Sequence, residues 1–384
     1  MKYTKIKNIN EYVSESLNPM KAPDTVFEMY SVPVFDTGHP EYLRGDEIAS
    51  NKVIVRKNDI LLCKINPRIN RVWVVADESE YQNIASSEWI VIRNTKYNPE
   101  FLAWYFRNPK FRKLMTSEVT GIGGSLTRAQ PKVVAEYPVP IMEREDQDAI
   151  ADVLHKVDCV IKVRQQELQK LDELIKARFV ELFGDVSTGN YKYETRKLGE
   201  VANVGSSHRV FTTEFVDKGI PFYRGTEIGE LANGIKPTDP YYISEEHYHR
   251  LANDETKPQI GDLLMPSISN KGQVWMVNTD EPFYYKDGRV LCVSPDKKLF
   301  EGKYIEYFMK AKTLVEYPKL GSGSTFAEFK IFLLKDIDVL IPPIELQKQF
   351  AAFVNKVDKS KVAVQKALEE AQLLFDSLMQ KYFG

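Results

Sequence analysis

The chain repeats its own sequence, and this duplication constrains its fold more than any other feature. Residues 147–158 read QDAIADVLHKVD and residues 347–358 read QKQFAAFVNKVD, with five identities at an offset of 200. The same offset relates GIGGS at 121–125 to GSGST at 321–325, and VPI at 139–141 to VLI at 339–341. Self-similarity at a fixed period indicates that one structural unit occurs twice.

The match continues upstream with shifted offsets, as loop insertions would produce. YLRGDEI at 42–48 resembles FYRGTEI at 222–228, NDILL at 58–62 resembles GDLLM at 261–265, and RVWVV at 71–75 resembles QVWMV at 273–277. This ordered series predicts two copies of a unit of roughly 190–200 residues.

Each copy has a mixed part followed by a long helix. Runs rich in β-branched and aromatic residues, at 52–55, 60–63 and 72–75, lie between Gly, Pro and Asn and predict strands. Prolines at 138–140 and 342–343 end a strand and precede a helix start. We expect an α+β fold with mixed domains at 1–142 and 185–343 and long helices at 143–184 and 344–384.

Both helices carry apolar residues at alternating steps of four and three, which is the spacing of a coiled-coil seam. The predicted seam residues are Ile150, Leu154, Val157, Ile161, Leu168, Leu171, Ile175, Phe350, Val354, Val357, Val364, Leu368, Phe375 and Leu378. An intramolecular antiparallel pair would separate the two mixed domains and give a pseudo-twofold repeat. The alternatives are a helical bundle core or pairing between chains. The charged opposite face is either solvated or a docking surface for partner subunits.

Composition excludes several classes of protein. The mean hydropathy is −0.36 and no apolar run reaches about 18 residues, so we expect no membrane span. Cys63, Cys159 and Cys292 are odd in number and far apart, which favours no disulfide framework and a reducing cytoplasm. The 52 basic and 54 acidic residues nearly cancel, so any nucleic-acid surface must be a local patch.

The sequence shows no catalytic motif. His247 and His249 lack a third metal ligand nearby, so we expect no metal site. The Gly-rich segments at 121–125 and 321–325 lack the Gly-Lys-Ser/Thr of a P-loop. The segment beginning Asn108-Pro109 has Lys110 where the tetrapeptide of amino-methyltransferases needs proline. We therefore expect a non-catalytic protein.

Polar residues that suit DNA contact follow the strand-like segments. Residues 44–71 hold seven cations and three acids, and 64–71 mixes cations with amides. Arg and Lys contact phosphate or guanine, and Asn pairs with adenine edges. The second copy has a less basic but equally polar stretch at 266–273, and Gly-Ser loops bring amides close to phosphate. The alternatives are a solvated loop and tight structural turns.

The candidate DNA-binding residues come from these segments. They are Arg44, Lys64, Asn66, Arg68, Asn70, Arg71, Ser125, Arg128, Arg224, Ser267, Ser269, Asn270, Lys271, Gln273, Ser322, Ser324 and Thr325. The copies share scaffold positions but differ in these loops, which is what two similar readers of different sequences require.

With RGDEI and RGTEI, GDLL, GSGST, PPIELQ and a long helix in each half, the chain resembles the specificity subunits of type I restriction-modification systems. The resemblance covers essentially the whole chain. Two departures are EREDQ at 143–147, where the second copy has a Pro-Pro form, and Lys361 and Ala371 at seam positions.

The resemblance implies two target-recognition domains, each reading half of a bipartite asymmetric site in double-stranded DNA, with the helices as spacer. It implies docking of two methyltransferase subunits and of restriction subunits in a prokaryotic cytoplasm, with no membrane partner. S-adenosylmethionine, ATP and magnesium would be used by those subunits, and this chain would bind no cofactor. The other hypotheses are an enzyme with unrecognised motifs and a coiled-coil adaptor that binds proteins only.

Overall fold

The chain folds into two compact units. The computed structural model describes residues 2–76, 78–120, 127–252, 256–269, 271–320 and 327–384. Unit 1 comprises Met1–Gln165 with Lys366–Gly384, and unit 2 comprises Gln166–Gln365. The four segments expected from the sequence remain a prediction, since the compact units divide both long helices.

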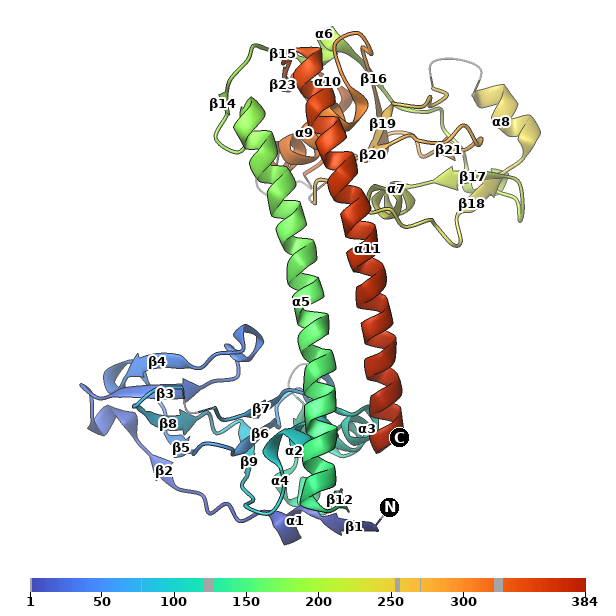
Figure 1. The fold of residues 1–384 in the computed structure, drawn as a ribbon. Helices are drawn as coiled ribbons and strands as arrows, with labels where there is room; N and C mark the ends of the chain where they lie inside the picture. The colour runs from blue at the N-terminus through green and yellow to red at the C-terminus, as the bar shows by residue number, and fades with distance from the viewer. Residues whose placement is uncertain (1, 77, 121–126, 253–255, 270, 321–326) are drawn as a thin grey trace. The chain divides into compact units, whose positions relative to one another are not determined.

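Unit 1 contains a five-stranded sheet in the order β2-β5-β8-β3-β4 and a three-stranded sheet in the order β7-β6-β9 (Figure 1). The strands of the first are Ser16–Leu17, Lys52–Ile54, Gln82–Ala85, Val26–Tyr30 and Glu41–Arg44, and those of the second are Val72–Val74, Ile60–Cys63 and Trp89–Ile92. Two further pairs join β1 (Lys2–Lys5) to β12 (Pro138–Ile141) and β10 (Val119–Thr120) to β11 (Arg128–Ala129). The helices are α1 (Ile6–Ile9), α2 (Pro99–Arg107), α3 (Pro109–Ser117), α4 (Pro131–Val134) and the first part of α5 (Arg144–Phe183).

Unit 2 contains a four-stranded sheet in the order β16-β22-β19-β20 and a three-stranded sheet in the order β18-β17-β21. The strands of the first are Ala202–Gly205, Val290–Pro295, Leu263–Pro266 and Trp275–Met276, and those of the second are Tyr241–Ile243, Ile220–Tyr223 and Tyr284–Tyr285. Two further pairs join β13 (Gly184–Asp185) to β14 (Asn190–Tyr191) and β15 (Thr195–Lys197) to β23 (Asp338–Leu340). The helices are α6 (Leu198–Val201), α7 (Gly225–Ala232), α8 (Glu245–Leu251), α9 (Gly302–Glu316), α10 (Ile331–Lys335) and the first part of α11 (Ile344–Phe383).

The strand pairings confirm the duplication. In both units an antiparallel hairpin, β6–β7 or β19–β20, pairs through its first strand with a third strand, β9 or β22. In both units a parallel pair, β3 with β8 or β17 with β21, forms part of a second sheet. The fold is α+β with an internal repeat, as expected.

A buried glutamine at each helix start makes the same contacts in both units. Gln147 Oε1 accepts a hydrogen bond from Asn98 N, and Gln347 Oε1 accepts one from Glu301 N. Both Nε2 groups donate to the carbonyl five residues upstream, at Met142 and Pro342. Gln147 and Gln347 are therefore identical because each makes the same contact. It joins the start of α5 to the N-terminus of α2 in unit 1, and the start of α11 to the N-terminus of α9 in unit 2.

Each unit completes its hydrophobic core with the end of one long helix and the start of the other. In unit 1, Ile150 and Leu154 of α5 share a core cluster with Met379 and Phe383 of α11. In unit 2, Phe179 of α5 lies 5.4 Å from Phe350 of α11, measured between ring centroids. The helices therefore run antiparallel within each unit.

The predicted seam residues are buried or half-buried along both helices. Lys361, a cation at a seam position, reaches Asp172 of α5 with Nζ 2.6 Å from Oδ1, so its charge is compensated. The seam omits Phe179 and Phe183, which are almost fully buried and contact Tyr304 of α9. The two phenylalanines therefore pack against α9 of unit 2 as well as against α11.

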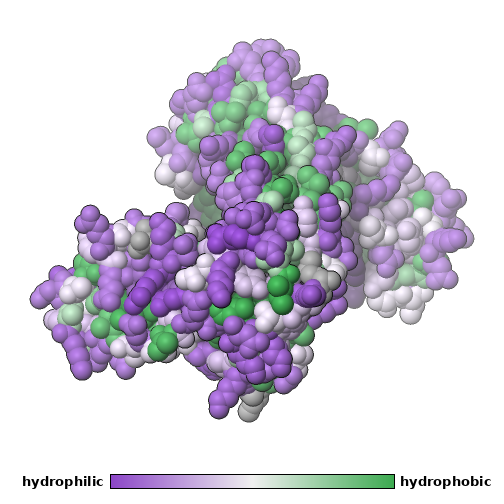
Figure 2. Space-filling view, turned by 60° about the horizontal axis from the view of Figure 1, so that its bottom comes forward, coloured by the Kyte–Doolittle hydropathy of each residue, from purple (hydrophilic) through white to green (hydrophobic). Residues whose placement is uncertain are grey.

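The face shown in Figure 2 is mainly hydrophilic, with hydrophobic residues scattered over it. No helix among the described residues combines the length and apolar character needed to cross a bilayer.

We predict that Phe179→Ala destabilises unit 2 by about 3–5 kcal/mol, because it removes a large side chain from a packed core. Urea unfolding followed by hydrogen exchange measures this, and the loss of protection should fall in residues 166–365. Leu174→Ala, at a site 47% exposed on the same helix, is the matched control and should change stability by about 0.5 kcal/mol or less. Equal effects of the two variants would contradict the shared core.

Candidate nucleic-acid interface

Nine of the twelve predicted DNA-contact residues that the structure describes lie at the tips of two equivalent hairpins. The tip of β6–β7, residues 64–71, is called loop A, and the tip of β19–β20, residues 267–273, is called loop B. Lys64 N donates to Glu88 O and Lys64 O accepts from Ala129 N, at 3.0 and 2.8 Å. Ser267 makes the same pair of bonds with Arg289 O and Phe329 N, at 2.9 and 2.7 Å. The two loops therefore start from the same scaffold position.

The far end of each loop rests on a helix through a residue in the left-handed region. Asn70 has φ 52° and its Nδ2 donates to Phe106 O of α2 at 3.1 Å. Gly272 has φ 64°, and a Cβ there would lie 2.8 Å from Lys310 O of α9. Glycine and asparagine are the residues that tolerate this conformation best. The same backbone turn thus carries a polar side chain in loop A and none in loop B.

A buried aspartate closes the base of each hairpin. Asp59 O accepts from Val75 N at 2.9 Å, and Asp262 O accepts from Val277 N at 2.8 Å. Their Oδ2 atoms each accept a backbone N–H three residues upstream, from Arg56 and Gln259, both at 2.8 Å. This repeated turn fixes where the loops emerge.

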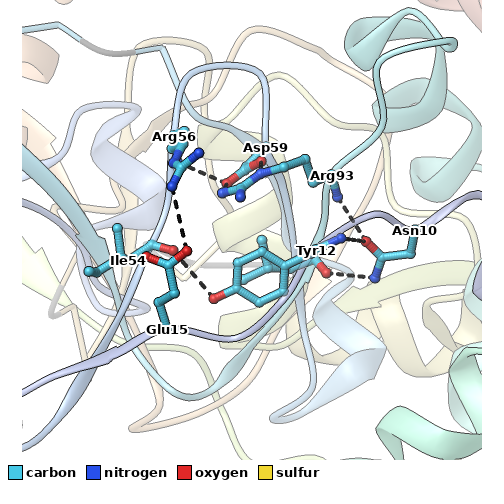
Figure 3. Close-up of polar contacts among 8 residues, drawn as sticks. Asn10, Tyr12, Glu15, Ile54, Arg56, Asp59 and Arg93 are labelled. Carbon is cyan, nitrogen blue, oxygen red and sulfur yellow. Dashed lines mark hydrogen bonds and ion pairs between the residues drawn. The ribbon is translucent and has the colours of Figure 1, made fainter.

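The charge that faces this aspartate differs between the units. In unit 1, Arg93 donates through Nε and Nη2 to both oxygens of Asp59 at 2.7 Å, and its guanidinium lies over the Tyr12 ring (Figure 3). The strand register places Ser294 at the equivalent position of unit 2. Burial raises the pKa of Asp262 above its ordinary value, although hydrogen bonds from Gln259 and Ser294 oppose the shift.

A flanking ion pair exchanges its charges between the copies. Arg128 Nε lies 3.2 Å from Glu88 Oε2 in unit 1, and Arg289 Nη1 lies 2.9 Å from Glu328 Oε2 in unit 2. Residue 88 corresponds to 289, and 128 corresponds to 328, because each pair flanks the anchor at Lys64 or Ser267. The sequence predicted Arg128 as a candidate DNA-binding residue but missed Arg289. Arg289 could have been found by comparing the copies, because it is a cation at the position where the first copy has Glu88.

Loops A and B hold four buried polar atoms that lack a hydrogen-bond partner within the described residues. They are Asn66 Oδ1, Asn70 Oδ1, Arg71 Nε and Ser267 Oγ. Buried polar atoms are rarely left unpaired in folded proteins, so a cluster of them calls for an explanation. A ligand that supplies the missing partners is one such explanation.

Loop B borders a cavity of about 710 Å³ in unit 2. Three predicted residues, Arg224, Ser267 and Gln273, line it together. Thr226, Lys286 and Arg289 line it as well and were missed by the sequence, because they lie outside the loop. The cavity therefore brings together hydrogen-bonding groups that are far apart in the chain.

The two predicted arginines of the Arg-Gly-x-Glu segments are held by carboxylates. Arg44 N donates to Glu47 Oε2 and Arg224 N donates to Glu227 Oε2, both at 2.7 Å. The Arg44 guanidinium bonds Asp24, whereas that of Arg224 bonds Glu227. Burial opposes ionisation of Glu227, but hydrogen bonds from Arg224 lower its pKa. These motifs act first as helix caps.

The remaining predicted residues differ in how far their side chains are exposed to solvent. Arg68 and Lys271 are exposed, Lys64 is half-buried, and Ser269 is buried with Oγ 3.3 Å from Gln273 O. Lys271 also borders a second cavity of unit 2, of about 700 Å³, together with Lys310. Ser125, Asn270, Ser322, Ser324 and Thr325 lie outside the described residues. Over the described ranges, no three His, Cys, Asp or Glu side chains gather as a metal site would require.

Comparison with known proteins agrees with this geometry. Residues 190–373 match the family model of the type I restriction modification DNA specificity domain. The type I restriction enzyme MjaVIII specificity subunit of Methanocaldococcus jannaschii is 23% identical over 346 residues, covering 83% of this chain and 78% of the relative.

Solved structures share the fold. A chain from a structural study of complex assembly and conformational transition of the type I R-M system aligns with a TM-score of 0.57 at 20% identity, covering 100% of this chain and 97% of that one. The S subunit of a type I system from M. genitalium aligns with a TM-score of 0.56 at 14% identity, covering 100% and 96%. The chain is therefore similar over most of its length to the specificity subunits of type I restriction-modification systems, and its residues 190–373 match their DNA specificity domain.

We predict that the two aspartates at the hairpin bases contribute differently to the stability of their units. Asp59→Asn leaves the half-buried Arg93 without its counter-charge at a buried site and should destabilise unit 1 by about 3–5 kcal/mol. The folded pKa of Asp262 is raised, so wild-type unit 2 should lose stability as pH rises from below the unfolded pKa through the folded pKa.

Asp262→Asn should abolish that pH dependence without a comparable loss of stability. Urea unfolding with hydrogen exchange, performed across this pH range, reports each unit separately. A destabilisation by Asp262→Asn as large as that by Asp59→Asn would show that Asp262 has a counter-charge of its own.

Proposed function

We propose that each unit of this DNA-specificity subunit reads one half of a bipartite, asymmetric site in double-stranded DNA. The observation that carries the proposal is the pair of equivalent hairpins with different polar tips. Loop A presents Lys64, Arg68 and Arg71 with two asparagines, whereas loop B presents serines, one lysine and Gln273. A common scaffold with different hydrogen-bonding groups is what two readers of different base sequences need.

The long helices suit a spacer in this proposal. Each has 40 residues, and each is anchored at its start by a buried glutamine in one unit and at its end by aromatic residues in the other unit's core. A helix rises by about 1.5 Å per residue, so its length is a direct measure of separation along it. We propose that this length sets the gap between half-sites.

The same proposal assigns the chemistry to partner subunits. Two methyltransferase subunits would dock on the helices, and restriction subunits would join them, in the cytoplasm of a prokaryote where the DNA lies. S-adenosylmethionine, ATP and magnesium would be bound by those subunits, and the present chain would act without a cofactor. The charged outer faces of α5 and α11 support docking, because they expose residues such as Lys170 and Glu173 of α5 and Glu370 of α11.

We predict that replacing residues 1–142 by those of another specificity subunit changes only one half of the methylated site. Sequencing of methylated adenines in cells that also carry the cognate methyltransferase measures both halves at once. The complex should lose affinity steeply as salt rises, because released counterions drive phosphate contact. A change in both halves would contradict the assignment of one half-site to each unit.

We predict that inserting seven residues into α5 near 165 and seven into α11 near 365 lengthens the gap by about three base pairs. Seven residues add about 10 Å of helix, and a base pair adds about 3.4 Å. Lys162→Ala, on the exposed face of α5, leaves helix length unchanged and should leave the gap unchanged. An unaltered gap after both insertions would remove the spacer role.

A further inference from the structure

Positions 71 and 273 are equivalent in the two units. Trp73 pairs with Leu61 in unit 1 and Trp275 pairs with Leu264 in unit 2, which fixes the register of the second hairpin strands. Arg71 and Gln273 stand two residues before these tryptophans and directly after the left-handed residues Asn70 and Gly272. The two positions therefore lie at the same place in the hairpin register, although Arg71 O accepts from Cys63 N and Gln273 O accepts from Ser269 Oγ.

No carboxylate pairs with Arg71 in the part of the chain that the structure describes, unlike three of the other predicted arginines. Arg44, Arg128 and Arg224 each form an ion pair with an acidic side chain. Arg71 forms none within the described residues, and its Nε is buried without a hydrogen-bond partner. The Arg71 side chain also hydrogen-bonds the Cys63 side chain, but a guanidinium has five N–H donors, so donors remain for an acceptor that the chain itself does not supply.

Gln273 has a comparably uncommitted side chain. Its carboxamide lines the cavity of about 710 Å³ and makes no hydrogen bond to another described residue. Ser267, 1% exposed, borders the same cavity with an Oγ that lacks a partner in the described chain. The Gln273 side chain lies against Gly229. A Cβ added at Gly229 would lie 2.5 Å from Gln273 Nε2, so the glycine leaves room for the Gln273 carboxamide.

The chemistry of the two side chains indicates different ligands. A guanidinium donates two parallel hydrogen bonds, which fit O6 and N7 of guanine in the major groove. A carboxamide both donates and accepts, which fits N7 and N6 of adenine. Phosphate accepts hydrogen bonds more strongly from a guanidinium than from an uncharged amide, so a phosphate contact at this scaffold position would favour arginine in both units.

We propose that Arg71 and Gln273 are the specificity-determining residues at equivalent places in the two half-sites, Arg71 selecting guanine and Gln273 selecting adenine. This inference rests on the proposed function, in which each unit reads one half-site. The cavity beside loop B then receives the edge of the base pair that Gln273 reads, and Ser267 Oγ gains its missing partner there.

The test exchanges the two side chains in the full-length chain, assembled with its methyltransferase subunits. Arg71→Gln should reduce the preference for guanine at one position of one half-site by about tenfold or more and favour adenine there. Gln273→Arg should produce the reverse change at one position of the other half-site. Selection from a random DNA pool and sequencing of methylated adenines measure both changes.

The hairpin bases provide matched controls. Arg56 and Gln259 occupy equivalent positions at the opposite end of the same hairpins, where each donates its backbone N–H to the basal aspartate. Arg56→Gln and Gln259→Arg make the same exchanges of side chain and should leave both half-sites unchanged. Hydrogen exchange of units 1 and 2 checks that the variants fold.

The outcomes separate this inference from the function on which it rests. An unchanged recognition sequence in Arg71→Gln, or an equal loss of affinity for all sequences with a smaller salt slope, overturns the inference and leaves the two-reader function standing. A wild-type complex that recognises no bipartite site overturns the function itself. If Arg71→Gln fails to fold, Arg71→Lys keeps the charge without the two-pronged geometry and should still lose the guanine preference.

Discussion

The constraint on which the structure depends is the burial of each long helix in two different cores. Phe179 and Phe183 end α5 inside unit 2, and Met379 and Phe383 end α11 inside unit 1. Because these side chains come from the other half of the duplicated sequence, neither half contains its complete core. Within each unit, packing of the two helix segments against each other and completion of the core are therefore one event energetically.

The duplication also shows which contacts the scaffold requires and which it leaves free to vary. The basal aspartates, the buried glutamines and the left-handed residue before the second hairpin strand recur in both units. The cation facing the aspartate and the sign of the flanking ion pair do not recur. These variations lie at the hairpin bases and beside the anchors of the loops, next to backbone contacts that recur in both units.

The seam between the long helices can be predicted from the sequence, whereas the packing of the helix ends against the domains cannot. The seam follows from a period of four and three residues along one helix, which local sequence displays directly. Phe179 is outside that period because it packs on Tyr304 and Tyr307 of α9, more than 120 residues away. Likewise, the pairing of Lys361 with Asp172 depends on the antiparallel register, which no single helix specifies.

The sequence by itself determined the duplication, the α+β class, the two long helices and the polar stretches that follow strand-like runs. These features depend on periodicity and on equivalent residues, which can be read along the chain. Only the tertiary structure decided which cations are neutralised by carboxylates, that Arg289 and Lys286 join Gln273 around one cavity, and that Arg71 has no acidic partner in the described chain. Those properties depend on distances between residues far apart in sequence, and such distances exist only after the strands and helices have packed.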